Sequence, residues 1–284
     1  MNDRALPAGS YYGAVGRRLD TTLTVVSEVI HPEARVLPEH DHALAYFCML
    51  VRGHYVETIA GRALDYAPFQ VAFHPARMPH RDAVGELGGR FLCLEIRERV
   101  LDDEAALRLR ATPAFLPGDV TLQLVRVYDS MVAGTLSPIV LDSAAWALCG
   151  DVSDARACVE RGFPRWLARC LSRIDDDYSE SLSVAGLARE AGVHPVHLAR
   201  EFRRRYGQTL GEYVHKVRIR SACARMTDGD ESLATIAADA GFADQSHFCK
   251  VFKALVGRAP SEFRRTTGHE ADRAKRRRRA TRTR

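Results

Sequence analysis

One pattern occurs twice in the C-terminal part of this chain and constrains its fold more than any other feature. Residues 187–192 return as residues 236–241, an offset of 49 positions. After one additional residue in the second copy the offset becomes 50: Leu198, Arg200, Phe202, Gly207 and Tyr213 return as Phe248, Lys250, Phe252, Gly257 and Phe263. Each copy predicts a short apolar helix, a glycine turn and a longer basic amphipathic helix. Two such helix-turn-helix units in tandem are typical of chains that bind DNA.

The first unit shows clear signals for its helix boundaries. Ser183 can cap a short helix, and Gly192 permits the sharp turn after it. The second helix is expected over residues 194–206. Its predicted buried stripe is Leu198, Phe202 and Tyr206. The outward face then consists of Val196, His197, Ala199, Arg200, Arg203 and Arg204.

The second unit repeats this arrangement after a long helix expected over residues 210–226. That helix is about 25 Å long at the standard rise and can hold two helix-turn-helix units a fixed distance apart. Ser232 and Asp244 are the expected caps of the two following helices. The predicted buried stripe is Phe248, Val251, Phe252 and Leu255. The outward face consists of Gln245, Ser246, His247, Cys249, Lys250 and Lys253.

Charge divides the chain into two unlike parts. Residues 1–163 carry 16 Lys and Arg against 21 Asp and Glu, whereas residues 164–284 carry 25 against 15. A basic C-terminal part beside an acidic N-terminal part indicates that one domain meets a polyanion. The last ten residues, 275–284, hold seven Lys and Arg. We expect them to be disordered, either adding salt-sensitive affinity for DNA or acting only as a solubilising tail.

The cysteines and the apolar runs indicate the compartment. Seven cysteines are scattered without a pair separated by two residues, which favours reduced, buried thiols. The first 20 residues show no apolar core of a signal peptide. The longest apolar run, residues 43–51, is too short to span a bilayer. We therefore expect a cytoplasmic protein that does not enter a membrane.

The residue pattern of the N-terminal part is typical of a β-domain. Residues 1–20 are expected to be loosely ordered. Short apolar or alternating runs punctuated by Gly and Pro then predict strands over residues 21–30, 43–51, 54–59, 69–73 and 90–96. Strands at this close spacing favour a small barrel or sandwich.

Helical periodicity replaces the strands after residue 99. Helices are expected over residues 102–110, 119–133 and 137–149, followed by a polar linker over residues 150–162. These helices either pair two subunits or pack back on their own domain. If they pair two subunits, the candidate interface positions are Leu124, Val127, Tyr128 and Met131.

Residues 165–266 resemble the DNA-binding domain of the AraC/XylS family of transcriptional regulators. The resemblance rests on the double motif and on a signature run of Ile236, Ala237, Gly241, Phe242, Phe248, Phe252, Lys253, Gly257, Pro260, Phe263 and Arg264. It implies that the second helix of each unit enters a major groove, with the two grooves adjacent on one face of the duplex. Thr235 departs from the family pattern, which often has an acidic residue there, and Ala199 is smaller than usual.

The resemblance and the chemistry of base recognition together predict which side chains contact DNA. Arg and Lys can bond guanine in the major groove, so Arg200 and Lys250, at equivalent repeat positions, are the leading candidates. The full set expected to read bases is Val196, His197, Ala199, Arg200, Gln245, Ser246, His247 and Lys250. The set expected to hold phosphates is Arg203, Arg204, Lys253 and Arg264.

About 60 residues of the N-terminal part resemble the cupin-like sensor barrel of the same family. The resemblance rests on His40, Asp41 and His42, on Gly53, and on a later run that ends at Pro79 and His80. Cupins that bind a metal use two His of an H-x-H, a Glu shortly afterwards and a later His. Here His40, His42 and His80 fit, but Tyr46 stands near the place where the Glu is expected.

The histidines therefore allow two interpretations. They either hold Zn²⁺ or Fe²⁺ with water, or line a barrel mouth and hydrogen-bond a ligand or the backbone. An apolar pocket with a few polar groups suits a small organic effector, although such aromatic residues are also common in cores. The candidate effector pocket consists of His40, His42, Tyr46, Tyr55, Phe73 and His80. No cofactor or bound metal is assigned.

The sequence as a whole predicts an α+β protein. We expect a cupin-like β-barrel sensor domain over residues 1–110, a helical dimerisation or linker region over 111–163, an all-α double helix-turn-helix domain over 164–267 and a basic tail over 268–284. The favoured function is a sequence-specific transcriptional regulator, more often an activator in this family, and not an enzyme. Expected partners are double-stranded DNA, RNA polymerase, a small-molecule effector and a second copy of the chain. The alternative function is a metal-dependent cupin enzyme with a DNA-targeting module.

Overall fold

The computed structural model describes residues 5–97, 114–115, 118–160 and 164–268. The chain forms two compact units, Met1–Ser153 and Asp154–Arg284, and each is described by itself. No described helix combines the length and the apolar character needed to cross a membrane. The helix predicted over residues 102–110 and the basic tail over 275–284 lie outside the described residues.

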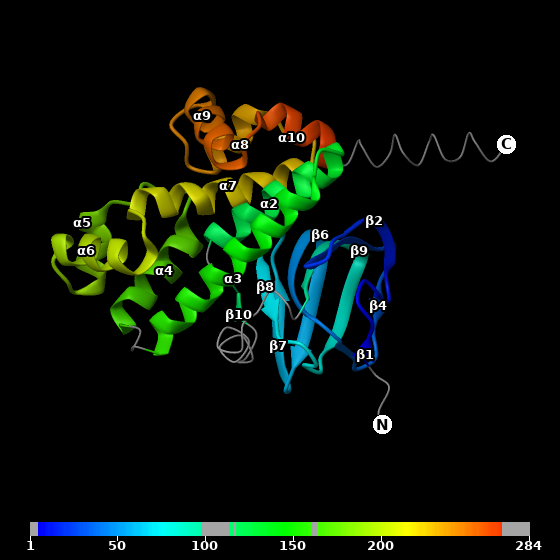
Figure 1. The fold of residues 1–284 in the computed structure, drawn as a ribbon. Helices are drawn as coiled ribbons and strands as arrows, with labels where there is room; N and C mark the ends of the chain where they lie inside the picture. The colour runs from blue at the N-terminus through cyan, green and yellow to red at the C-terminus, as the bar shows by residue number, and fades with distance from the viewer. Residues whose placement is uncertain (1–4, 98–113, 116–117, 161–163, 269–284) are drawn as a thin grey trace. The chain divides into compact units, whose positions relative to one another are not determined.

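An eight-stranded antiparallel sheet forms the centre of the N-terminal unit (Figure 1). Its strands are β2 (Ala14–Asp20), β3 (Thr24–His31), β4 (Arg35–Val36), β6 (Ala45–Ile59), β7 (Arg62–Tyr66), β8 (Val71–His74), β9 (Arg81–Ile96) and β10 (Ala114–Phe115). The strand order is β10-β8-β6-β9-β3-β2, while β4 pairs with β9 and β7 pairs with β6. The short strands β1 (Ala5–Leu6) and β5 (Asp41–His42) form a separate parallel pair.

The closed barrel expected from the sequence is not observed among the described residues. Strands β2 and β10 stand at the two ends of the strand order, and no pairing between them is seen in the described ranges. A barrel requires its first and last strands to pair. The structure therefore shows an antiparallel sheet, and the cupin-like barrel stays a prediction.

The long strands β6 and β9 organise this sheet. Their pairing runs from Ala45 opposite Ile96 to Thr58 opposite Arg81. Register shifts flank Gly53, whose φ of 102° lies in the left-handed region. A side chain on Gly53 would collide with the backbone of Gly88. The two strands predicted over residues 43–51 and 54–59 are thus one strand with an irregularity near its middle.

Strand β2 corrects the expectation that residues 1–20 are loosely ordered. It pairs with β3 along most of its length, with one irregularity between Val15 and Arg18. Most of its side chains are exposed or half-buried. An edge strand of this kind is held by its backbone hydrogen bonds, so its sequence lacks the regular apolar alternation used to predict strands.

Two helices follow the sheet in the chain. Helix α2 (Gly118–Ala133) matches the helix predicted over residues 119–133. Helix α3 (Pro138–Glu160) continues through most of the segment predicted to be a polar linker. A single interior glycine such as Gly150 costs a helix only about 1 kcal/mol relative to alanine, so polarity and one glycine were weak evidence for a helix end.

The four positions predicted for a dimer interface are not available to a second subunit. Leu124, Val127, Tyr128 and Met131 are buried, with exposed fractions of 0, 2, 0 and 7%. The Tyr128 hydroxyl donates to Glu28 Oε1 of β3 at 3.4 Å. Helix α2 therefore packs on its own unit, which was the alternative interpretation. Among the described side chains of α3, the exposed large apolar ones are Ile139, Val140 and Trp146.

Seven helices make up the described part of the C-terminal unit. They are α4 (Arg165–Asp177), α5 (Val184–Ala191), α6 (Pro195–Tyr206), α7 (Leu210–Asp228), α8 (Leu233–Asp239), α9 (Gln245–Val256) and α10 (Pro260–Thr267). Helices α5 and α6 form the first helix-turn-helix and α8 and α9 the second, with the long α7 between them in the chain (Figure 1). The all-α double motif is confirmed.

The predicted caps account for these helix boundaries. The Ser183 hydroxyl accepts the Gly186 N–H at 3.0 Å, and the Ser232 hydroxyl accepts the Thr235 N–H at 3.0 Å. The Asp244 carboxylate accepts the His247 N–H at 2.7 Å. Each bond satisfies a backbone donor that the first turn of a helix leaves without an intrahelical partner.

Candidate functional site

Helix α6 presents most of its predicted outward face to solvent. Val196 is 66% exposed, and Ala199, Arg200, Arg203 and Arg204 are also exposed. Its interior positions Leu198 and Phe202 are fully buried, whereas Tyr206 is only half-buried. This helix therefore presents a mixed apolar and cationic surface on the side away from the core.

Helix α9 repeats that arrangement. Gln245, Ser246, Lys250 and Lys253 are exposed. Phe248 and Phe252 are fully buried, as their equivalents in α6 are. The predicted interior positions Val251 and Leu255 are half-buried, and Val256 takes the third buried place.

His197 and His247, two of the predicted base-reading residues, are half-buried, whereas most of the others are exposed. The His197 ring lies 5.5 Å from the Trp166 ring of α4. The His247 ring lies 5.5 Å from both the His215 ring of α7 and the Phe242 ring of the turn. These packing contacts fix both imidazoles against the domain.

The predicted phosphate contacts are not equivalent either. Arg203 and Lys253 are exposed cations. The Arg204 guanidinium donates to Glu201 at 2.6 Å, so it would exchange one anion for another on meeting a phosphate. Arg264 is half-buried, and two of its guanidinium nitrogens are withdrawn from solvent. Less of Arg264 is therefore available to a phosphate.

Sequence reasoning missed a residue that links the segment before the first helix-turn-helix to the turn of the second. Arg218 of α7 donates from Nε to the Tyr178 carbonyl at 2.8 Å, from Nη2 to the Glu180 carbonyl at 2.8 Å and from Nη1 to the Gly241 carbonyl at 2.5 Å. Tyr178 and Glu180 follow α4, and Gly241 forms the turn of the second motif. A guanidinium satisfied by three carbonyls on two segments is a structural crosslink. In the sequence Arg218 had been indistinguishable from the surface charges of α7.

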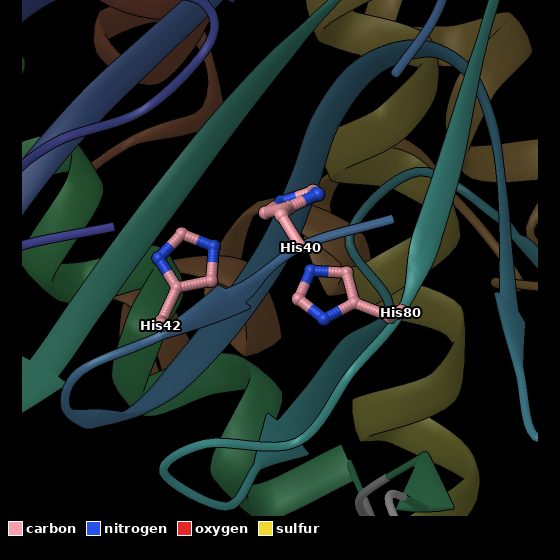
Figure 2. A group of neighbouring side chains, drawn as sticks. All are labelled: His40, His42 and His80. Carbon is pink, nitrogen blue, oxygen red and sulfur yellow. The ribbon is translucent and has the colours of Figure 1, made fainter. Parts of the chain in front are cut away.

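The N-terminal unit contains a second cluster of functional side chains. His40 and His80 form an isolated antiparallel bridge, with N–H to carbonyl distances of 3.0 and 2.9 Å. Their ring centroids lie 4.3 Å apart, and the His42 ring is 5.5 Å from that of His80. Figure 2 shows the three imidazoles gathered from two neighbouring segments. The structure thus brings together the three histidines that the sequence singled out.

Two buried carboxylates and a fourth histidine complete this cluster. Glu57 of β6 lies opposite Asp82 of β9 in the strand pairing. The Glu57 carboxylate accepts the Tyr66 hydroxyl at 2.6 Å and lies 2.9 Å from His74 Nε2. Its other oxygen is 3.9 Å from His80 Nε2. No Glu follows the H-x-H at the expected place in the sequence. The pairing of β6 with β9 nevertheless brings two carboxylates, Glu57 and Asp82, to the cluster.

Burial sets the ionisation of the cluster. Burial, together with the charges of His80, His40 and His74, lowers the pKa of His42 to about 2. Burial likewise lowers the pKa of His80 and raises that of Asp82. For Glu57, burial acts to raise the pKa, but the charge and hydrogen bond of His74, the charge of His80 and the hydrogen bond from Tyr66 together hold it at about 2. His42 is thus a neutral imidazole near pH 7.

A small, partly open pocket lies beside these groups. Five of the six predicted effector-pocket residues line it, namely His40, His42, Tyr46, Tyr55 and His80. Phe73 does not, because it is buried against Phe47 with the ring centroids 5.0 Å apart. Successive residues of a strand point to opposite faces, so Phe73 packs into the core on a side other than that of its neighbour His74.

Comparisons with known proteins place the C-terminal unit. A family profile described as a helix-turn-helix domain matches residues 187–266. The probable transcription factor PqrA of Proteus vulgaris is 34% identical over 100 residues, which are 35% of this chain and 78% of that protein. The bifunctional transcriptional activator/DNA repair enzyme AdaA of Bacillus subtilis is 30% identical over 105 residues, 37% of this chain but only 50% of AdaA.

A solved structure of ToxT from Vibrio cholerae is 14% identical, covers 86% of this chain and 98% of that chain, and gives a TM-score of 0.37. The family assignment rests instead on the sequence matches and on the observed double motif. PqrA is matched over most of its length, and residues 187–266, which the family profile matches, contain most of the two motifs with their exposed second helices. The chain belongs to the AraC/XylS family of DNA-binding transcriptional regulators.

Proposed function

We propose that this regulator reads an asymmetric DNA site by placing α6 and α9 in successive major grooves. One observation carries the proposal: the two equivalent helices, one before and one after α7 in the chain, both present exposed, cationic faces. Helix α7 has 19 residues and is therefore about 28 Å long at the standard rise. Successive major grooves on one face are about 34 Å apart, a spacing that two motifs beside such a helix can match.

The two faces differ in the chemistry that they offer to bases. Arg200 and Lys250 supply donors suited to the acceptors of guanine. Val196 and Ala199 offer apolar contacts to a thymine methyl, whereas Gln245 and Ser246 offer hydrogen bonds to base edges. His197 and His247 are half-buried and positioned by packing. The two half-motifs of the DNA site are therefore expected to have different sequences.

Affinity comes mainly from contacts to the DNA backbone. Arg203, Arg204 and Lys253 are the leading phosphate contacts, with Arg264 as a partly buried fourth. Each neutralised phosphate releases counterions, so binding weakens as salt rises. The basic tail would add to this effect without adding sequence preference.

The N-terminal unit is proposed to be a sensor of cupin type that binds a small effector in the pocket beside His42 and Tyr46. The pocket combines aromatic walls with convergent polar groups, which is the usual character of small-molecule sites. We further propose that the chain acts in the cytoplasm as an activator, contacts RNA polymerase, forms a homodimer and catalyses no reaction itself.

Selection of bound fragments from genomic or random DNA by the full chain tests this function. The expected product is a site of two unlike half-motifs about one helical turn apart. Its affinity should exceed that of a shuffled duplex by about 10³-fold or more at physiological salt. Equal affinity for every duplex at that salt would refute a sequence-specific regulator.

A further inference from the structure

Donor atoms for a metal ion converge in the N-terminal unit. His40, His42 and His80 are 3, 5 and 2% exposed, and Asp82 is 6% exposed. One ring nitrogen from each histidine lies within 4.8 Å of the others. His80, Asp82 and Glu57 form a second group within the same limit. His80 belongs to both groups, and Asp82 Oδ2 lies 3.7 Å from His40 Nε2, so the space beside His80 is bounded by imidazoles and carboxylates.

Backbone hydrogen bonds fix which nitrogen of two histidines faces that space. His40 Nδ1 lies 2.9 Å from the Pro38 carbonyl, and His80 Nδ1 lies 3.0 Å from the Met78 carbonyl. A carbonyl oxygen can only accept, so each Nδ1 carries the proton. In a neutral imidazole the other nitrogen, Nε2, then presents a lone pair. Metal-binding histidines are commonly oriented by this kind of bond from the opposite ring nitrogen.

The Nε2 lone pairs of His40 and His80 do not accept strong hydrogen bonds. His40 Nε2 is 3.7 Å from Asp82 Oδ2, and His80 Nε2 is 4.0 Å from Asp82 Oδ1. A charged hydrogen bond between such groups would be about 2.7–2.9 Å long. The Tyr46 hydroxyl approaches His80 Nε2 only to 3.4 Å. Imidazole lone pairs and a carboxylate therefore face one another with no proton closely shared between them.

A bound cation would accept these imidazole lone pairs and neutralise the charge of the carboxylate. With bonds of about 2.0–2.2 Å, the ligand atoms of a tetrahedral zinc site lie about 3.4 Å apart, close to the His40–Asp82 separation. Three atoms beside the space, His42 Nδ1, Asp82 Oδ1 and Glu57 Oε1, are buried without a hydrogen-bond partner among the described residues. Buried polar atoms are rarely left in this state.

We propose that His40, His42, His80 and Asp82 bind one divalent transition-metal ion of the zinc class. Asp82 provides the carboxylate from a position two residues after His80, not from the position after the H-x-H where metal-binding cupins have their Glu. Glu57 Oε1, which is 3.9 Å from His80 Nε2, lies beside the proposed site. Metal binding goes beyond the proposed reading of DNA and does not depend on it.

Titration of the untagged full-length chain tests the proposal. The protein is stripped with a chelator, dialysed and titrated with ZnCl₂ by calorimetry. The expected result is one Zn²⁺ per chain, with a rise in the thermal midpoint of the N-terminal unit. Substitution with Co²⁺ should give the visible absorption of a four-coordinate site. Because changes outside the ligand set already weaken metal sites about 10–100-fold, His80→Ala should weaken binding by about 100-fold or more.

Matched variants separate this site from other histidines and from misfolding. His54→Ala removes an exposed histidine of the same unit, and His247→Ala removes the half-buried histidine of α9. Both changes should leave the stoichiometry and affinity of Zn²⁺ binding unchanged. Asp82→Asn keeps the shape of the side chain and should weaken Zn²⁺ binding while the metal-free protein unfolds at a temperature near that of the parent chain.

Two results would overturn the proposal. One is binding of less than about 0.1 Zn²⁺ per chain at saturating ZnCl₂, without the cobalt absorption. The other is full Zn²⁺ binding by folded His80→Ala and Asp82→Asn proteins. Since zinc is titrated without DNA, and DNA binding is measured on chelator-treated protein, either failure leaves the DNA-reading proposal to its own test.

Discussion

At the scale of single residues, the buried acid Glu95 gives the N-terminal unit a pH-dependent stability. Its side chain is fully buried on β9 and accepts the Gly9 N–H at 2.6 Å. Burial is the largest influence on this carboxyl and raises its pKa from 4.5 to about 7, against the lowering effect of the Gly9 bond. The folded chain therefore keeps the proton of Glu95 to a higher pH than the unfolded chain does.

The direction of the effect follows from that difference. Stability from this group is complete below about pH 4.5 and is lost as the pH rises towards 7. The loss is about 3 kcal/mol in the free energy of unfolding. Glu95→Gln mimics the protonated acid, so its stability should change less than that of the parent chain between pH 5 and pH 8.

Urea unfolding of the N-terminal unit at several pH values measures this effect. Glu33→Gln, which removes an exposed carboxylate, is the control and should keep the pH dependence of the parent chain. An unchanged pH dependence in Glu95→Gln would show that another group is responsible.

Gly241 is a second position where adding a single atom, a Cβ, should change the stability of the chain. Its φ of 81° is left-handed, and a side chain there would collide with the carbonyl of Ser179. Gly241→Ala should destabilise the C-terminal unit by about 1–3 kcal/mol. Gly257→Ala shares the left-handed strain, with a φ of 97°, but has open space around it. In thermal unfolding Gly257→Ala should therefore be the milder change, and equal losses would contradict the proposed collision.

At the scale of helices and strands, Arg218 crosslinks the segment before α5 to the turn of the second motif. Arg218→Met keeps the length and helix propensity of the side chain but removes three hydrogen bonds to carbonyls. A hydrogen bond to a charged group contributes about 1.5–3 kcal/mol, so the geometry between the motifs should loosen. Binding to a duplex with both half-motifs should weaken more than binding to a duplex with one.

A matched control for that change lies two residues away. Arg220 reaches Asp175 at 3.3 Å in an exposed ion pair, and such pairs contribute about 0–1 kcal/mol. Arg220→Met should leave the preference for the complete site intact. Equal losses on both duplexes for Arg218→Met, measured by fluorescence anisotropy, would contradict a role in spacing the motifs.

Local signals were sufficient for the helices but not for the contacts between distant segments. Caps such as Ser183 and Asp244 and the apolar stripes predicted α5 to α9 because both act within a few residues. The strand register could not be predicted in the same way. It places Glu57 opposite Asp82 and Tyr46 opposite His74, residues separated by more than two dozen positions along the chain. Pairing between strands depends on the whole sheet.

The distribution of charge predicted some features of the C-terminal part correctly and left others undecided. The basic character of the C-terminal part agreed with its motifs, yet the sequence could not tell the half-buried crosslink Arg218 from the exposed Arg200. Both are arginines on amphipathic helices, and only tertiary packing separates them. The predicted interface residues of α2 failed for the same reason, since an apolar stripe does not reveal which surface covers it.

At the scale of the whole molecule, two compact units divide the chemistry. The N-terminal unit concentrates buried imidazoles and carboxylates, whereas the C-terminal unit exposes cations on two equivalent helices. This division is suited to a regulator in which one unit senses and the other reads DNA. The central claim is that α6 and α9 read different bases within one site.

Binding to a panel of duplexes with single base-pair changes tests this claim most directly. Arg200→Ala should lose about 1–3 kcal/mol of discrimination at one base pair. Lys250→Ala should lose a similar amount at another base pair, about 10 base pairs away. Arg165→Ala, which removes an exposed cation of α4, should keep the base preferences of the parent chain. If Arg200→Ala and Lys250→Ala instead weaken every duplex equally, or change none, α6 and α9 are not the reading helices.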